Sequence, residues 1–292
     1  MRGNAEAHDL VAPGSLGAVL DLLAAEPGKW TPIAGGTELM VAFSAGRLSA
    51  SNLVSLWGIR DLRFIDVGPN SVVIGAATTF LDLRRDVVIA TDLPLLARAA
   101  SWIGSIANQG RATLGGNLVN GSPAADSSPV LLAYDAEIEM VSVRGKRRIP
   151  YAEFHTGYKR NVLAPDELLY AIHLPRRFSR HRQYLRKVGT RRAMAIAKVA
   201  LAATARMDDD MIHEIRLGAA SLAPYPTRLK RTEAALFEQT LSDETVQAAR
   251  RAMLAEVNPI DDIRSTAEYR SRVAVNLLDE FLAQLRKGGS NE

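Results

Sequence analysis

The sequence predicts an α+β protein with more than one folding unit, and three observations lead to this prediction. The first ~60 residues have the pattern of a β-α-β unit. The middle of the chain mixes strands with short helices. Beyond about residue 182, three strand patterns precede three helical stretches. With 292 residues, the chain is long enough for two or three subdomains with their own cores.

The N-terminal unit begins with a helix after Ser15, a residue type that favours helix N-caps. The apolar face of this helix is formed by Leu16, Val19, Leu20 and Leu23, and Pro27-Gly28 ends it. A strand over 31–34, a helix over 38–45 and a strand over 52–56 complete the unit.

The middle region begins with strands over 63–67 and 72–76, and the Gly68-Pro69-Asn70 cluster between them predicts a hairpin. Thr79 is placed to cap a short helix. Further helices are expected over 95–103 and 128–134, and further strands over 136–143 and 167–174.

The composition changes over 176–182, which indicates a domain boundary. Strands are expected over 183–188, 197–207 and 212–220, with an acidic turn at 208–210, so that they form a small antiparallel sheet. Helices are expected over 227–237, 242–257 and 267–285. The last has Val273, Leu277, Leu278, Phe281 and Leu285 on one face.

Composition excludes several function classes. The net charge is +4 and the basic residues are spread along the chain, which disfavours nucleic-acid binding. There is no cysteine, so disulfides and iron–sulfur ligation by this chain are impossible, and a reducing cytoplasm is expected. The five histidines have no zinc-binding spacing, so no metal site is expected. No stretch has the pattern of a signal peptide or a membrane span.

Two segments with paired glycines are the most informative part of the sequence. The first is PIAGGTEL, with Gly35, Gly36 and Thr37; the second is RATLGGNLVNGSPAADSSP, with Gly115 and Gly116 between Thr113 and Asn117. Glycine lets backbone N–H groups approach a ligand closely, and free N–H groups favour anions. Two such turns suit a ligand with two adjacent phosphates, such as a dinucleotide.

The competing interpretation is that these are ordinary turns or helix ends, where Gly-Gly pairs are common. Neither segment matches the Rossmann pattern G-x-G-x-x-G, and neither is a P-loop with Gly-Lys-Ser/Thr. From the residues alone, only two anion-binding loops are predicted.

Five motifs in order resemble the flavin-binding subunit of molybdenum hydroxylases, the xanthine dehydrogenase and carbon monoxide dehydrogenase family. The motifs are IAGGTEL (33–39), TLGGNLVNGSPAADSSPVLLAYDAEIEM (113–140), EFHTGYKRNVLAPDELLYAIHLP (153–175), YLRKVGTRRAMAIAKVALAA (184–203) and NPIDDIRSTAEYR (258–270). The resemblance covers nearly the whole chain.

The resemblance implies an FAD-binding domain of the vanillyl-alcohol-oxidase and UDP-acetylenolpyruvoylglucosamine-reductase type over 1–177. Its two α+β subdomains, about 1–57 and 58–177, would hold noncovalent FAD between them. Residues 178–292 would form the C-terminal flavoprotein domain of the carbon monoxide dehydrogenase type, with a small antiparallel sheet and helices.

The resemblance also implies the contacts with FAD. The pyrophosphate would be wrapped on one side by Pro32, Ile33, Ala34, Gly35, Gly36, Thr37, Glu38 and Leu39 and on the other by Thr113, Leu114, Gly115, Gly116 and Asn117. Asp126 would lie near the ribityl or ring portion, and the flavin region would be touched by Ile103, Leu169 and Lys187. No catalytic proton-transfer residue is identified.

Several of these residues have a simpler alternative role. Asp126 could cap the helix that follows it, and Glu38 could act only as an acid near a helix N-terminus. Leu169 could be a core residue of its strand, and Lys187 could be a solvated charge. For Trp102, beside Ile103, core packing is favoured over flavin stacking.

The function implied by the resemblance is electron transfer by an FAD-dependent oxidoreductase subunit. Electrons would come from 2Fe–2S clusters on one partner chain, fed by a molybdopterin subunit, and would leave through FAD to an acceptor such as NAD+. Such a heterotrimer agrees with the lack of cysteine here. The alternatives are a self-contained flavoenzyme with its own small substrate, and a scaffold subunit without flavin. The intact glycine pairs argue against the scaffold, and the substrate of the complex is not predicted.

Overall fold

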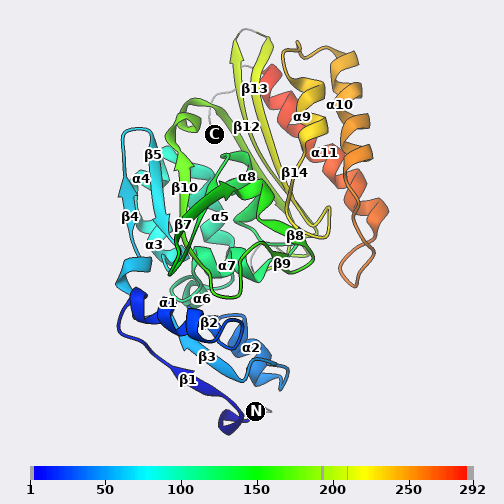
Figure 1. The fold of residues 1–292 in the computed structure, drawn as a ribbon. Helices are drawn as coiled ribbons and strands as arrows, with labels where there is room; N and C mark the ends of the chain where they lie inside the picture. The colour runs from blue at the N-terminus through cyan, green and yellow to red at the C-terminus, as the bar shows by residue number, and fades with distance from the viewer. Residues whose placement is uncertain (1–2, 192–193, 209, 288–292) are drawn as a thin grey trace.

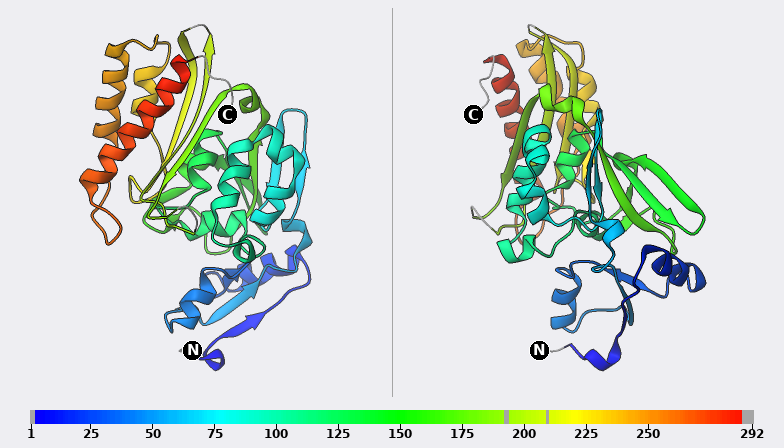
Figure 2. Two further views of the ribbon diagram at one scale, coloured as in Figure 1. Left: turned by 180° about the vertical axis from the view of Figure 1, so that it is seen from behind. Right: turned by 90° about the vertical axis from the view of Figure 1, so that its left-hand side faces the viewer.

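The computed structural model describes residues 3–191, 194–208 and 210–287. The chain forms three successive regions, each built around its own sheet, with the N-terminal region at one end of the molecule and the last helices at the other (Figure 1). The views in Figure 2 show the same order from behind and from the side. The predicted α+β class is confirmed.

The N-terminal region is a parallel three-stranded sheet with strand order β1-β3-β2. Its elements are β1 (Asp9–Val11), α1 (Leu16–Ala25), β2 (Thr31–Ile33), α2 (Leu39–Ser44) and β3 (Asn52–Ser55). Ser15 caps α1 as predicted, because its hydroxyl accepts a hydrogen bond from the Ala18 N–H. Val19 and Leu23 of α1 pack with Val54 of β3 in the core of this region. The sequence did not predict β1, whose three residues lack a buried face.

The middle region is an antiparallel sheet of order β4-β5-β10-β6-β7. Its strands are β4 (Ile65–Val67), β5 (Ser71–Gly75), β6 (Glu137–Ser142), β7 (Gly145–Pro150) and β10 (Leu168–Pro175). The predicted hairpin of β4 and β5 is confirmed, and β7 follows β6 as an edge strand of exposed basic residues. The small hairpin of β8 (His155–Gly157) and β9 (Arg160–Asn161) lies outside this sheet.

Six short helices pack beside the middle sheet: α3 (Phe80–Arg85), α4 (Val87–Asp92), α5 (Pro94–Trp102), α6 (Ile106–Gln109), α7 (Leu114–Asn120) and α8 (Ser128–Ala133). Thr79 caps α3 in a capping box with Asp82. The sequence did not predict α4 and α6. Trp102 packs against the main core, as favoured from the sequence.

The C-terminal region is an antiparallel sheet of order β11-β12-β13-β14 with one face covered by the last three helices (Figure 1). Its elements are β11 (Arg182–Val188), β12 (Val199–Asp208), β13 (Met211–Ala220), β14 (Thr227–Arg228), α9 (Lys230–Leu236), α10 (Asp243–Glu256) and α11 (Ala267–Arg286). The helix expected over 227–237 is shorter than predicted, because Thr227 and Arg228 pair with β13 as a strand. Residue 209, in the predicted acidic turn, lies outside the described residues.

Four 3-10 helices complete the described structure: Ala5–Ala7, Arg60–Leu62, Tyr151–Glu153 and Arg176–Arg180.

Helix α8 joins the middle and C-terminal regions. A Cβ on Gly218 of β13 would lie 2.0 Å from the carbonyl oxygen of Pro129, so only glycine allows this close packing of strand on helix. Thr204 of β12 donates a hydrogen bond to the carbonyl of Ala133 at 3.1 Å. At the end of α8, Asp135 forms ion pairs with Arg177, Arg216 and Arg228. These contacts fix the C-terminal sheet against the middle region that precedes it.

Candidate functional site

The first glycine segment is an open turn between β2 and α2. Gly36 has a φ of +73°, which L side chains rarely adopt, so its backbone conformation favours glycine. The backbone N–H groups of residues 36 to 39 have no acceptor among the described residues. Consecutive free N–H groups form a concave nest that binds anionic oxygens. The turn therefore has the donors that a pyrophosphate needs.

Other residues of this segment lie around the turn. Glu38 precedes α2 and makes no capping hydrogen bond; its carboxylate is 3.4 Å from Lys159 Nζ in the β8–β9 hairpin. Of the remaining predicted residues, Pro32 and Ile33 lie in β2, Ala34 and Thr37 lie in the turn, and Leu39 is the first residue of α2.

The structure brings the two glycine segments into direct contact. A Cβ on Gly35 would lie 1.7 Å from the carbonyl oxygen of Arg111, so the two backbones touch where glycine lacks a side chain. The Arg111 guanidinium lies 3.8 Å from the centroid of the Trp57 ring, a cation–π contact at the end of the first region. Segments 76 residues apart in the chain thus form one continuous surface.

The second glycine segment is a helix start, not the turn expected from the sequence. Thr113 is the N-cap of α7, and its hydroxyl accepts a hydrogen bond from the Gly116 N–H at 3.1 Å. Gly115 is buried, its N–H donates to the Ala76 carbonyl at 2.9 Å, and a Cβ there would lie 2.6 Å from the Ala76 Cβ. Gly115 therefore allows close packing on the end of β5, and Gly116 is the exposed member of the pair.

Two polar residues are held in place here, Asn117 in α7 and Asp126 in the loop that follows this helix. Asn117 accepts a hydrogen bond from the Ser127 hydroxyl at 2.7 Å. Asp126 forms an ion pair of 2.7 Å with Lys187 of β11, and both side chains are about nine-tenths buried, with 11% and 9% exposed. This pair joins the middle region to the C-terminal sheet.

The Asp126–Lys187 pair settles two alternatives from the sequence. Asp126 is directed to Lys187, and the N-cap residue of α8 is Ser127, without a side-chain capping bond. Lys187 is not a solvated charge, because its side chain is only 9% exposed. Burial raises the pKa of Asp126, and the neighbouring Lys187 opposes this shift. The second carboxylate oxygen, Oδ1, is buried without a partner among the described residues, so it is free to accept a ligand hydrogen bond.

The apolar residues of the predicted site are buried or half-buried in the core. Leu114 is fully buried, and Leu169, at a β-bulge of β10, is 5% exposed, which confirms its core role. Ile103 follows the last turn of α5 and is half-buried.

The sequence reasoning missed a buried polar cluster behind α8. The Tyr151 hydroxyl donates to Ser128 Oγ at 2.8 Å and lies 3.1 Å from His155 Nε2. Burial lowers the pKa of His155, which favours its neutral form. Tyr and His are common core residues, so spacing gave no signal for this cluster. It fixes the start of α8, two residues after Asp126.

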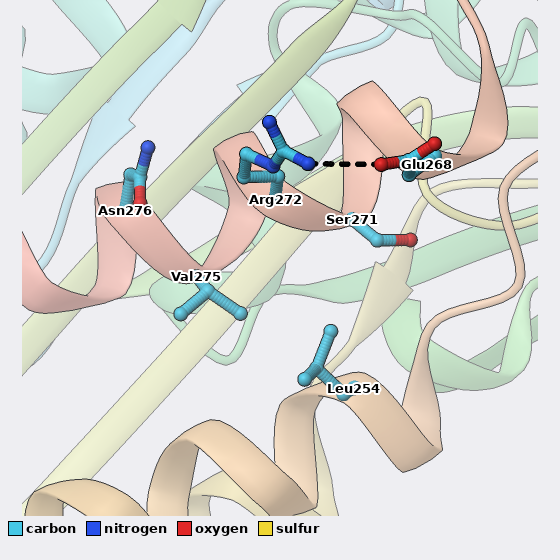
Figure 3. A pocket seen from close by; sticks show the side chains of 6 residues that line it. All are labelled: Leu254, Glu268, Ser271, Arg272, Val275 and Asn276. Carbon is cyan, nitrogen blue, oxygen red and sulfur yellow. Dashed lines mark hydrogen bonds and ion pairs between the residues drawn. The ribbon is translucent and has the colours of Figure 1, made fainter.

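Two surface hollows lie apart from the glycine segments. One is a groove between α10 and α11 lined by Leu254, Glu268, Ser271, Arg272, Val275 and Asn276 (Figure 3). Its dashed contact is the 2.8 Å pair of Arg272 and Glu268 along α11. The other is lined by Thr190, Arg191, Met194, Ala195, Ile196 and Arg264. Among the described residues, no cluster of three metal-ligating side chains is present, and no helix is long and apolar enough to cross a membrane.

Comparison with known proteins defines the class of this protein. The family described as the FAD binding domain in molybdopterin dehydrogenase matches residues 5–177, and the CO dehydrogenase flavoprotein C-terminal domain matches residues 184–285. The chain therefore belongs to the family of FAD-binding subunits of molybdenum hydroxylases of the xanthine and carbon monoxide dehydrogenase type, which are oxidoreductases.

Individual relatives agree over nearly their whole length. The chain is 32% identical to the xanthine dehydrogenase FAD-binding subunit of Escherichia coli O157:H7 over 272 residues, which covers 92% of this chain and 93% of the relative. It is 27% identical to the carbon monoxide dehydrogenase medium chain of Hydrogenophaga pseudoflava, covering 93% and 94%. A solved structure of carbon monoxide dehydrogenase from that organism, which lacks the Mo-pyranopterin moiety, superposes with a TM-score of 0.91 at 27% identity, covering 97% of this chain and 98% of that one.

Proposed function

We propose that this chain is the electron-transfer subunit of a molybdenum hydroxylase. It would bind FAD noncovalently, accept electrons from iron–sulfur clusters on a partner chain and pass them to an acceptor such as NAD+. The observation that carries the proposal is the contact of Gly35 with Arg111, which brings the two glycine segments together. Asn117 of the second segment is bonded to Ser127, the residue next to Asp126 of the Asp126–Lys187 pair.

The residues at this junction fit FAD. The free N–H groups of residues 36 to 39 are suited to the pyrophosphate, and Gly36 keeps the turn open. On the other side, the exposed Gly116 lets a phosphate approach the start of α7, with Thr113 and Asn117 beside it. Bound FAD would supply the electron-carrying chemistry.

The flavin end of the site would lie at the junction with β11. The free Oδ1 of Asp126 is an acceptor for a ligand hydroxyl or N–H group, and the Lys187 ammonium places positive charge beside it. Leu169 and Ile103 would provide apolar contact and exclude water. The protein's part is thus to bind, orient and set the electrostatics.

The domain division proposed here follows the same junction. Residues 1–177, with subdomains of about 1–57 and 58–177, would bind FAD, and residues 178–292 would close the site through Lys187. The chain has no cysteine to ligate clusters, so iron–sulfur and molybdopterin centres would lie on two partner subunits of a cytoplasmic heterotrimer.

Purification of the complex from its source tests the proposal. We expect the complex to show a flavin absorption spectrum and to contain both iron and molybdenum. We also expect it to reduce NAD+ when this acceptor is tested. Acid precipitation should release the flavin into the supernatant as FAD, since the link is noncovalent. Full physiological turnover by this chain without iron or molybdenum would instead establish the self-contained flavoenzyme.

A further inference from the structure

The first glycine turn has free N–H groups because the carbonyl groups of the same peptides are held on the opposite side. The peptide between Gly35 and Gly36 is trans, so its carbonyl oxygen and its N–H group point in opposite directions. The Gly35 carbonyl accepts a hydrogen bond from Arg111 Nε at 3.4 Å, and the Gly36 carbonyl accepts one from the Met40 N–H at 2.8 Å. The N–H groups of Gly36 and Thr37 therefore point away from these two donors.

The two carbonyl groups are held by different means. Met40 belongs to α2, so its bond to Gly36 is part of the helix start itself. The bond to Gly35 comes instead from a side chain 76 residues away. A peptide between two glycines can turn over at low steric cost, because neither residue has a Cβ. Such a rotation relates turn types II and I and changes the φ of the second residue from positive to negative. The φ of +73° at Gly36 thus belongs to the orientation in which Arg111 holds the carbonyl.

The Arg111 guanidinium is itself held by an aromatic ring, that of Trp57, whose centroid lies 3.8 Å from Arg111 Cζ. Arg63 Cζ is 5.9 Å from the centroid of the same ring, and Arg63 forms two hydrogen bonds with Asp82, of 2.9 and 3.0 Å. Asp82 belongs to the capping box of α3 with Thr79. This series of contacts links the first glycine turn to the start of α3 in the middle region.

The charge of Arg111 acts on the peptide that it holds. Arg63 is neutralised by Asp82, whereas Arg111 forms no ion pair with a carboxylate among the described residues. A cation that donates to a carbonyl oxygen polarises the whole peptide, which makes the N–H group at the other end a stronger donor. The Gly36 N–H is therefore prepared to bind an anionic oxygen.

We propose that Arg111 is a positioning residue of the pyrophosphate site, an inference that rests on the proposed function. Stacked on Trp57, it keeps the Gly35–Gly36 peptide in the orientation that offers the Gly36 N–H to a phosphate, and it strengthens that hydrogen bond through the peptide. Without the guanidinium, the peptide turns over part of the time and presents a carbonyl oxygen, which repels a phosphate.

The test compares Arg111→Met with Arg98→Met in the full chain. Arg98 is a matched control, because it is also exposed, its Cζ lies 5.6 Å from the centroid of the Trp102 ring, and it forms no ion pair among the described residues. Flavin is removed, and the Kd for added FAD is measured by flavin fluorescence. We expect Arg111→Met to bind FAD about tenfold more weakly and Arg98→Met to match the wild type.

A conservative variant separates positioning from packing. Arg111→Lys should bind FAD within about threefold of the wild type, because an ammonium group can also donate to the Gly35 carbonyl and lie over an aromatic ring. Urea denaturation should give the same midpoint for the wild type, Arg111→Met and Arg111→Lys, since the side chain is exposed.

A measurement without ligand tests the orientation of the peptide directly. The Gly36 amide is followed by NMR after labelling with ¹⁵N-glycine, and its signal is identified by its absence in Gly36→Ala. We expect this signal to be single and sharp in the wild type and in Arg98→Met. In Arg111→Met it should broaden or split into two, because the peptide exchanges between two orientations.

Other outcomes overturn the inference. Wild-type affinity for FAD in Arg111→Met, or a single sharp Gly36 signal, would show that the peptide keeps its orientation without Arg111. Weak binding by Arg111→Lys would show that the donated hydrogen bond is not what acts, and a lowered urea midpoint of Arg111→Met would give Arg111 a structural role. If the wild type binds no FAD, the proposed function fails together with this inference; if only the variants depart from expectation, the proposed function stands.

Discussion

The two glycine segments look alike in the sequence, but the structure uses them differently. In the first, Gly36 adopts a left-handed conformation and the following N–H groups are free. In the second, Gly115 and Gly116 begin a helix, and their N–H groups are bonded to Ala76 and Thr113. The comparison teaches that glycine can serve to expose the backbone to a ligand or to let two parts of the protein pack closely.

Gly35 belongs to the packing type although it stands beside Gly36, and its substitution should have the largest effect. Because a Cβ would overlap the Arg111 carbonyl at 1.7 Å, we expect Gly35→Ala to lower the free energy of unfolding by more than about 3 kcal/mol. Urea denaturation measures this. Gly58→Ala is the control, since nothing lies within 4 Å of its added Cβ. Equal stability of the two variants would contradict the close contact.

The next largest effect is expected from replacing Lys187, the buried partner of Asp126. Lys187→Met leaves a buried carboxylate without its cation, which should cost about 3 kcal/mol of stability at neutral pH. The double variant Asp126→Asn with Lys187→Met should recover most of the loss, because no charge remains buried. Chemical denaturation of the wild type, Asp126→Asn, Lys187→Met and the double variant gives the coupling energy between the two side chains. A coupling near zero would refute a buried pair.

Alanine at Gly36 of the first segment and at Gly116 of the second sharpens the comparison. Gly36→Ala should lose about 1 kcal/mol of stability through its positive φ. Gly116→Ala should also lose about 1 kcal/mol, because its Cβ would lie 2.8 Å from the Thr113 hydroxyl that caps α7. A larger side chain, as in Gly116→Val, should still reduce flavin content while circular dichroism shows an intact fold. Full flavin occupancy in Gly116→Val would mean that no phosphate approaches this glycine.

The smallest expected effect is a pH dependence of stability that comes from Asp126, after the second segment. The pKa of Asp126 is raised above 3.8 in the folded protein, so folding favours the protonated carboxyl. Its contribution to stability is fully present below pH 3.8 and is lost as pH rises through the raised pKa. Relative to Asp126→Asn, the wild type should therefore lose stability over that range. Denaturation curves of both proteins at several pH values check this. If the difference in stability between the wild type and Asp126→Asn does not change with pH, Asp126 is in contact with water.

Local patterns were enough to predict most helices and strands. Ser15, Thr79 and Ser242 cap helices as their residue types favour, and the strands that form β11, β12 and β13 pair as expected. The failures have local causes too. β1 is short and exposed, β14 is a two-residue strand within a helical pattern, and the helix start at Gly115-Gly116 contradicts the low helix propensity of glycine.

The sequence by itself determined the elements, the absence of cluster ligands and, through five ordered motifs, the family that the comparisons confirm. Only the tertiary structure decided which glycine packs against which backbone, and that Asp126 and Lys187 form a buried pair. The physical reason is that helix and strand patterns arise from neighbours within a few residues. Contacts such as Gly35 with Arg111 join segments 76 residues apart and depend on the packing of the whole chain.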